Sequence, residues 1–417
     1  MTDPASSDSP VSVTETRCAI VGAGPAGAIL ALLLARAGVE VALLESHADF
    51  DRDFRGDTIH PATLELLAAL GLSERLHELP HGKLRTMRIL TPTGSVTLAD
   101  LSRLRTPFPY VMTLPQVKLL ELLVAEAGKS PNFQLRMQAN VQRLVEADGE
   151  VRGVRYRDAD NAWHEVRAEL TVAADGRFSK VRHLAGIEPK GTAPPMDVVW
   201  FRLPKRATDE AHGAEICVSG GHFVVLLDRG DEWQIGYVIL KGTFAAVRSA
   251  GLPELRKGLA STVPWLADRV EVLQDWKQVA VLNVESTRVD CWHKPGLLLI
   301  GDAAHAMSPV GGVGINVAIQ DAVAAANLLT VPLRRGRPSD DELAAVQRTR
   351  EPAVKAIQRV QKLLQETIAK PGLTAGSEFR LPLPLRLALK IPGIRNIPGY
   401  MMAFGPHRVR LQEQPAR

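Results

Sequence analysis

The stretch from residue 18 to residue 45, CAIVGAGPAGAILALLLARAGVEVALLE, contains the pattern that decides the fold. The apolar run 18–21 predicts a strand that ends at a glycine, and the apolar run 28–35 predicts a helix that closes at residues 36–38. Residues 39–44 predict a second strand, which ends at Glu45. A strand, a helix and a strand in this order predict a parallel sheet with helices packed on it, an α/β fold.

The junction between the first strand and the helix contains three glycines, Gly22, Gly24 and Gly27. In a dinucleotide-binding unit the first permits a tight turn, the second lets the backbone approach a pyrophosphate, and the third lets the helix pack on the strand. The helix N-terminus, with Ala26 in its first turn, offers N–H groups to the phosphates. Glu45 lies 18 residues after Gly27 and is placed to accept hydrogen bonds from ribose hydroxyls. A glycine-rich turn without a ligand is the alternative, which the flanking strand, helix and acid disfavour.

Composition narrows the class of protein. The chain has 417 residues, of which 46% are hydrophobic and 23% charged, and its net charge is +4. These values exclude a disordered or fibrous chain and argue against a nucleic-acid binder. The three cysteines, Cys18, Cys217 and Cys291, lie far apart without metal-ligand spacing. We therefore expect no metal site and a reduced, cytoplasmic setting.

The chain offers no clear membrane or export signal. No run reaches the ~18 apolar residues that a membrane span needs. Residues 1–16 are polar and lack an apolar core, so we expect a disordered leader rather than a signal peptide.

A second glycine-rich junction lies far along the chain. The apolar run 295–300 predicts a buried strand, and it is followed by GDAAH at 301–305 and by AMSPVGGVGIN at 306–316. A helix is expected from about Val317 to Leu329, with Asp321 in its first turns. A second strand-to-helix junction of this kind indicates that the chain returns to the same ligand.

With a third motif, ADGRFSKVR at 174–182, the sequence resembles the class A FAD-dependent aromatic hydroxylases of the para-hydroxybenzoate hydroxylase type. The resemblance extends to about residue 365. It implies a Rossmann-like FAD-binding domain of the glutathione-reductase type, an inserted antiparallel β-sheet substrate domain and C-terminal helices. Two positions depart from the family pattern, Val313 where glutamine is frequent and Phe178 where a small residue is usual.

The resemblance assigns roles to particular residues. Glu45 would hold the adenosine ribose, Asp302 the ribityl chain, and residues 56–58 would pass the edge of the flavin ring. Asp175 would lie near the pyrophosphate and the nicotinamide cofactor. Further residues are expected to touch FAD or to line the reactive face of its ring: Arg55, Gln116, Pro309, Gly311, Gly312, Gly314, Ile315 and Asn316. Reduced flavin carries negative charge, and backbone N–H groups at 314–316 would stabilise it at close range.

Several of these residues have structural alternatives. Asp175 could cap a helix that begins near Ser179, and Asp302 could be a turn or cap residue. Arg55 could be a surface arginine, and Gln116 an ordinary residue at the start of a helix over 116–126. We expect His305 to be structural rather than an acid–base group.

Residues 191–284 break the alternation of strands and helices. Strands are expected at 198–203, 214–218, 222–227 and 232–240, with a hairpin turn at 228–231. They would form an antiparallel sheet that roofs the flavin. Five side chains are candidates for the substrate pocket, of which alternation lets about half face the ligand: Trp200, Arg202, His222, Phe223 and Tyr237. His222 and Tyr237 are the candidates for a catalytic role.

The expected domains follow from these elements. The FAD-binding domain comprises 17–85, 111–190 and 285–338, and the substrate domain comprises 86–110 and 191–284. Residues 339–417 supply C-terminal helices, with one expected from Asp340 to about Lys370, and a tail. The tail over 379–409 mixes apolar residues with arginine and could contact a membrane surface or an apolar substrate's entrance, or pack on its own domain.

The implied function is a monooxygenase that consumes NADH or NADPH and O₂. It would hydroxylate or epoxidise an electron-rich aromatic, polyketide or quinolone-like compound through a flavin C4a-hydroperoxide. Only one G-x-G-x-x-G unit follows a strand, so NAD(P)H is expected to bind transiently over FAD. Alternatives are a flavin-dependent halogenase, whose usual W-x-W-x-I-P motif is absent, a reductase of prenyl-type double bonds, and a non-catalytic escort-type binder. The protein is expected to be a monomer or a homodimer.

Overall fold

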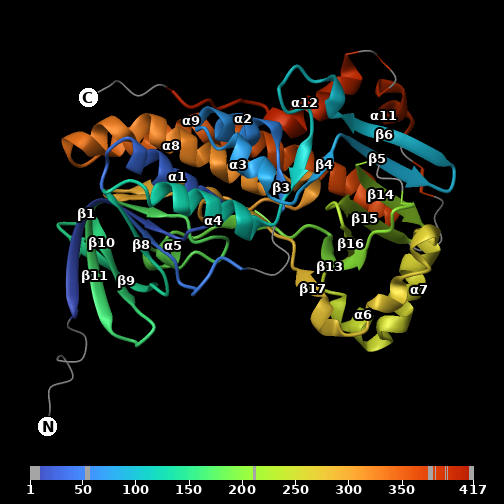
Figure 1. Ribbon diagram of the computed structural model, residues 1–417, viewed down its shortest axis with the longest axis horizontal. Helices are drawn as coiled ribbons and strands as arrows, with labels where there is room; N and C mark the ends of the chain where they lie inside the picture. The colour runs from blue at the N-terminus through green and yellow to red at the C-terminus, as the bar shows by residue number, and fades with distance from the viewer. Residues whose placement is uncertain are drawn as a thin grey trace, which may run out of the picture.

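The computed structural model describes residues 10–51, 57–209, 213–373, 379–380, 382–389, 391 and 393–412. Figure 1 shows two sheets side by side, with long helices lying along the first one. The first sheet has the order β19-β20-β11-β1-β2-β8, and its five strands from β20 to β8 are parallel. Their bounds are β1 Ser12–Val21, β2 Val41–Leu44, β8 Phe133–Arg136, β11 Trp163–Ala173, β19 His293–Lys294 and β20 Leu297–Leu299. The antiparallel hairpin of β9 (Asn140–Ala147) and β10 (Glu150–Arg157) extends it through β11.

The N-terminal strand starts earlier than the sequence predicts. β1 begins at Ser12, and its first residues pair in register with β11, Ser12 opposite His164. The expected disordered leader over 1–16 is therefore wrong for residues 12–16. Their polar side chains suit a strand whose backbone is paired while its faces remain partly exposed to solvent.

Helices cover the first sheet and form its core. α1 (Pro25–Arg36) packs between β2, α4 (Gln116–Ala127) and α8 (Gly314–Arg335), and ten of its residues are buried. α8 is longer than predicted, and α9 (Asp340–Leu364) lies against it. α9 runs on through η8 (Gln365–Ala369) and α10 (Lys370–Gly372), so the helical stretch predicted to end near Lys370 ends at Gly372.

The segment that comprises η7 (Val310–Gly312) and α8 has the length and composition of a membrane span. Among the described residues, Val310–Arg335 is long and apolar enough to cross a bilayer by length and composition, although the sequence predicted no such segment. Most of its apolar window is buried inside the protein, 61%, as expected for the core helix of a soluble protein, so this is weak evidence for a span.

The second sheet has the order β17-β13-β16-β15-β14-β5-β6. It is antiparallel except for the parallel pair of β14 and β5, a difference from the fully antiparallel sheet expected. β5 and β6 come from residues 86–100, which precede the other strands of this sheet in the sequence. The strands are β5 Thr86–Thr91, β6 Gly94–Asp100, β13 Met196–Pro204, β14 Ala214–Ser219, β15 His222–Asp228, β16 Glu232–Leu240 and β17 Ala280–Leu282.

The two faces of the second sheet have different covers. The outer face, which bears Phe201, Ile235 and Tyr237, packs under α6 (Phe244–Ala250) and α7 (Leu252–Thr262). The inner face, which bears Trp200, Phe223, Val225 and Val238, packs against residues of η8, against Leu373 and Phe379, and against Val310. The inner face is therefore the one turned toward the second glycine-rich junction.

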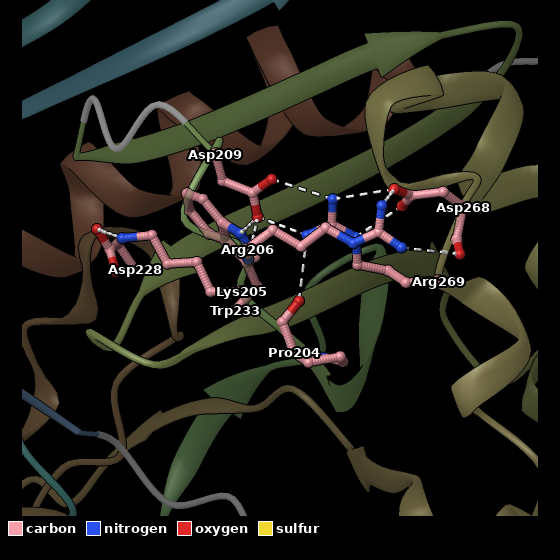
Figure 2. A network of polar contacts seen from close by, with 8 residues as sticks. All are labelled: Pro204, Lys205, Arg206, Asp209, Asp228, Trp233, Asp268 and Arg269. Atoms are coloured by element: carbon pink, nitrogen blue, oxygen red, sulfur yellow. Dashed lines mark hydrogen bonds and ion pairs between the residues drawn. The ribbon is translucent and has the colours of Figure 1, made fainter.

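A network of polar contacts fixes the end of the outer face (Figure 2). Asp209 accepts hydrogen bonds from Trp233 Nε1 at 2.9 Å and from Arg269 at 2.5 and 3.0 Å. Burial alone would raise the pKa of Asp209, but these hydrogen bonds outweigh it and lower the pKa to about 2. Lys205 pairs with Asp228 at 2.8 Å, at the start of the β15–β16 hairpin.

Smaller elements connect the two sheets. A three-stranded sheet joins β3 (Thr58–Ile59), β7 (Val111–Thr113) and β4 (Gly82–Leu84), and β12 (Lys190–Thr192) pairs with β18 (Ser286–Arg288). The remaining helices are α2 Pro61–Ala69, α3 Ser73–Glu78, α5 Lys180–Leu184, α11 Leu383–Ala388 and α12 Ile397–Phe404. All three cysteines are unpaired.

Candidate functional site

The first glycine-rich junction leaves space on one side only. Gly22 has φ +99°, and a Cβ added there would lie 2.5 Å from the Ala174 carbonyl oxygen. A Cβ on Gly27 would lie 1.9 Å from the Gly22 carbonyl oxygen, whereas one on Gly24 would meet nothing within 4 Å. The fold therefore requires Gly22 and Gly27, and the open side at Gly24 fits a pyrophosphate.

The predicted ribose acid closes this junction. Glu45 follows β2 and is 8% exposed. Its carboxylate accepts hydrogen bonds from the backbone N–H of Ala23 at 3.1 Å and of His47 at 3.1 Å. The carboxylate also accepts from Ser46 Oγ at 3.3 Å and pairs with His47 Nδ1 at 2.6 Å. These contacts orient Glu45 at the junction, and its contact with a ribose stays a prediction.

The two glycine-rich junctions meet in space. Gly301 has φ +58°, and a Cβ added there would lie 3.1 Å from Ala318 of α8 and 3.3 Å from Ala26 of α1. Asp302 follows in the same short turn, η6 (Gly301–Ala303). The turn that carries the predicted ribityl-binding acid is thus held between the two helices whose N-termini belong to the site.

A buried charged network supports this turn. Asp321 accepts hydrogen bonds from the Gly301 N–H at 3.1 Å, from His305 Nε2 at 2.6 Å and from Arg350 Nε at 2.8 Å. The side chains of Asp321 and Arg350 are fully buried. Burial by itself raises the pKa of Asp321, but His305 and Arg350 outweigh it and hold the pKa below its usual range. The sequence analysis did not identify Arg350, because the pattern of a helix does not show which of its arginines is buried.

The start of α8 provides free backbone donors. η7 (Val310–Gly312) contains Gly311 at φ +80° and Gly312 at φ +62°, conformations that favour glycine. The first backbone hydrogen bond of the following helix runs from Val317 N to Val313 O at 2.9 Å. The N–H groups of 314–316 therefore have no acceptor within the helix, which fits their expected role beside a reduced flavin ring.

Side chains from three elements hold this loop. Thr58 Oγ1 donates to the Gly312 carbonyl oxygen at 3.0 Å. Asn316 accepts from His60 N and from Thr63 Oγ1, each at 2.8 Å. From α9, the Gln361 amide donates to the carbonyl oxygens of Ser308 and Val310, each at 2.8 Å. The Asn316 amide also donates to the Thr58 carbonyl oxygen at 3.1 Å, so this side chain ties α8 to β3 and α2. The predicted cofactor contact of Asn316 stays a prediction. Gln361 was not identified from the sequence.

A second buried ion pair joins the segment before β3 to the second sheet. Asp57 pairs with Arg229 of the β15–β16 hairpin, and the two side chains are 8% and 5% exposed. Asp57 also accepts from the Gln116 backbone N–H at 3.2 Å, and Arg229 donates to Gln234 at 3.2 Å. Burial raises the pKa of Asp57 more strongly than Arg229 lowers it. Arg229 was read from the sequence only as part of a turn. The predicted contact of Gln116 with the cofactor stays a prediction for its side chain.

Two other predicted residues have different outcomes. The Asp175 carboxylate accepts from Ser179 Oγ at 2.5 Å and from Val181 N at 3.0 Å, so it supports the start of α5, whose N-cap is Ser179, close to the structural alternative. Its Cα would lie 2.7 Å from a Cβ on Gly22, which leaves its backbone beside the first junction. Arg55, together with Gly56, lies outside the described residues.

The catalytic role expected for His222 and Tyr237 stays a prediction, and their placement does not favour it. Tyr237 Oη and His222 Nδ1 share a hydrogen bond of 2.5 Å, and both lie under α7, where a Cβ on Gly258 would be 2.6 Å from Tyr237 Oη. They line a cavity of about 210 Å³ on the outer face. Alternation along β16 places Tyr237 beside Ile235, whereas Val310 of η7 packs on the other face. Of the remaining candidates, Trp200 and Phe223 are on the inner face, and Arg202 pairs with Glu232 at 3.4 Å.

No group of three or more His, Cys, Asp or Glu side chains that could hold a metal ion is found in the part of the chain that the structure describes. The polar groups that converge at the two junctions are backbone N–H donors and carboxylate acceptors. This combination suits a dinucleotide with a flavin ring.

Comparison with known proteins agrees with this geometry. The family described as "FAD binding domain" matches residues 15–361, most of the chain. The chain therefore belongs to this family of FAD-binding proteins.

Within it, the chain is a flavin-dependent monooxygenase of the aromatic hydroxylase class. It is 33% identical to 6-methylpretetramide 4-monooxygenase of Streptomyces rimosus, over 97% of this chain and 96% of that protein. Two solved structures share the fold. PqsL of Pseudomonas aeruginosa in complex with 2-aminobenzoylacetate has a TM-score of 0.74 at 21% identity, covering 85% of this chain and 97% of that one. OxyS anhydrotetracycline hydroxylase of Streptomyces rimosus has 0.73 at 24%, covering 94% and 76%.

Proposed function

We propose that this protein uses NAD(P)H and O₂ to hydroxylate a fused-ring phenolic compound of the aromatic polyketide type. The observation that carries the proposal is the apolar inner face of the second sheet, which packs toward Val310 of the glycine-rich loop 310–316, the flavin loop. The relative that matches almost the whole chain is named for 6-methylpretetramide, which supports the fused-ring class.

The residues of the flavin loop supply electrostatic stabilisation. Bound FAD would take two electrons from NAD(P)H and activate O₂ for transfer of one oxygen atom. The N–H groups of 314–316 would hold the negative charge that the reduced ring carries at the start of α8. Gly311 and Gly312 let the backbone run close to the ring, and Thr58 fixes the loop from the other side.

The inner face would bind the substrate and exclude water. Trp200 packs on Gly236, where an added Cβ would lie 2.8 Å from the indole ring, and Phe223 lies in the same apolar cluster. Aromatic side chains of this kind suit a flat ring system, which stacks on them or meets their edges. A dry chamber also limits loss of the activated oxygen as hydrogen peroxide.

The nicotinamide cofactor would bind transiently, because the sequence shows one dinucleotide-binding unit. We also place the protein in the cytoplasm, a proposal that its three unpaired cysteines support.

The test is a panel of fused-ring phenols, single-ring phenols and alkylated quinolones, added to the FAD-loaded protein with NADH or NADPH. A fused-ring phenol should accelerate NAD(P)H oxidation many-fold and yield a product heavier by one oxygen atom. Acceleration by single-ring phenols or quinolones alone would overturn the proposed substrate class. An absence of oxygenated product from every compound would contradict the proposed reaction.

A further inference from the structure

Exposed apolar side chains concentrate in one segment near the C-terminus. Of the sixteen exposed large hydrophobic residues among those described, six lie between residues 383 and 400, each at least 40% exposed. They are Leu383, Leu387, Ile391, Ile394, Ile397 and Tyr400. Scattered single residues of this type are ordinary on a protein surface, whereas a contiguous group marks an interaction site.

The same segment carries only positive charge. From residue 379 to residue 412 the sequence contains six arginines and lysines and no aspartate or glutamate. Arg386 and Arg395, which alternate with the apolar side chains, are exposed. We call the six apolar residues with Arg386 and Arg395 the tail surface.

The other side of this segment is attached to the body of the protein. Ala403 and Phe404 of α12 are buried, and a Cβ on Gly399 would lie 3.2 Å from the Asp100 carbonyl oxygen at the end of β6. His60 Nδ1 donates to the Met402 carbonyl oxygen at 2.6 Å. Figure 1 shows α12 beside β6, on which it packs. The tail surface is therefore the solvent-facing side of a segment whose other side already packs on the protein.

We propose that the tail surface docks on an anionic lipid bilayer. The apolar side chains would enter the boundary between headgroups and acyl chains, and Arg386 and Arg395 would contact lipid phosphates, as in interfacial amphipathic segments. Charge decides between this occupant and a second copy of the chain. Two copies joined by a two-fold axis through this surface would bring Arg386 and Arg395 of one copy toward the same arginines of the other, so like charges would repel.

The docking would place the inner face, which we propose to bind the substrate, near the lipid. Phe379, the first residue of the cationic segment, and Leu373 pack in the cluster of the inner face. An apolar ring compound dissolved in the bilayer would thus meet the protein next to this face. This step rests on the proposed function, whereas the docking itself does not.

The test is co-sedimentation of the full-length, FAD-loaded protein with vesicles of phosphatidylcholine, with or without phosphatidylglycerol. The wild type should bind the anionic vesicles, bind the neutral ones weakly, and lose affinity as salt rises. Arg386→Glu with Arg395→Glu should weaken binding roughly tenfold or more. Leu387→Glu with Ile397→Glu should do the same through the apolar side, because both residues are exposed and the fold does not need them. Val272→Glu, an exposed apolar position elsewhere, is the matched control and should bind like the wild type.

Equal binding by all variants, or no binding by the wild type, would overturn the proposal. A dimer in gel filtration that Leu387→Glu with Ile397→Glu converts to a monomer, without vesicle binding, would assign the tail surface to a second copy instead. Because sedimentation needs no turnover, a protein that binds vesicles but oxygenates no compound would refute the proposed function and leave the docking intact.

Discussion

His60 makes the stability of this fold depend on pH in a way that one substitution can isolate. The side chain is 1% exposed, at the start of α2, and its Nδ1–H donates to the Met402 carbonyl oxygen. Burial lowers the pKa of His60 from 6.5 to about 4, although the hydrogen bond to Met402 opposes the shift. His60→Asn keeps a side-chain N–H donor near the Nδ1 position, suits a helix N-cap and removes the titration.

The sign and size follow from the two pKa values. Between about pH 4 and 6.5 the unfolded chain binds a proton at His60 that the folded protein does not, so stability rises with pH there. The contribution is fully present above the unfolded pKa and is lost as pH falls toward the folded pKa. A difference of about 2.5 pKa units corresponds to about 3 kcal/mol.

The assay is urea unfolding at several pH values from about 7 to about 4. Other groups also titrate over this range, so the quantity of interest is the difference between wild type and His60→Asn. Wild type should lose about 3 kcal/mol more than the variant on acidification. His183→Asn, at an exposed histidine, is the control and should follow the wild type. Parallel pH curves for wild type and His60→Asn would refute the reasoning.

Three further predictions test the site. Gly24→Val should fold normally but purify without yellow colour, because its side chain fills the open side of the junction. Gly27→Val should fail to fold, because its Cβ overlaps a carbonyl oxygen. A Gly24→Val protein with full FAD would contradict the assignment. Asp321→Asn should lower the free energy of unfolding by roughly 3–5 kcal/mol, since it leaves a buried arginine unpaired. Urea unfolding measures this, and an effect no larger than that of a surface Asp→Asn change would contradict it. Phe223→Ala, on the inner face, should raise the share of NAD(P)H oxidation that ends as hydrogen peroxide. Tyr237→Phe, on the outer face, should leave that share unchanged. The reverse result would mean that the outer face, not the inner one, binds the substrate.

The local elements could be predicted because their signals are local. The run of residues 18–45 contains its own turn, helix cap and strand ends, and the structure has β1, α1 and β2 there. The four strands expected between 198 and 240 are present for the same reason, since alternation and turn residues define each one.

What could not be predicted depends on contacts between distant segments. Alternation shows that Tyr237 and Val238 face opposite ways, but only the position of α7 shows which face is covered. The pair of Asp57 and Arg229 joins residues 172 apart, and neither sequence neighbourhood indicates a buried charge. Arg350 could not be predicted either, because its partner Asp321 lies on another helix.

The most direct test of the central claim is the origin of the oxygen atom in the product. The FAD-loaded protein would be supplied with NAD(P)H, with a compound that accelerates NAD(P)H oxidation, and with ¹⁸O₂ in ordinary water. Mass spectrometry would then measure the mass of the product. A monooxygenase predicts one ¹⁸O atom in each product molecule and no turnover without O₂. Product oxygen that comes from water, or full turnover in the absence of O₂, would contradict the account.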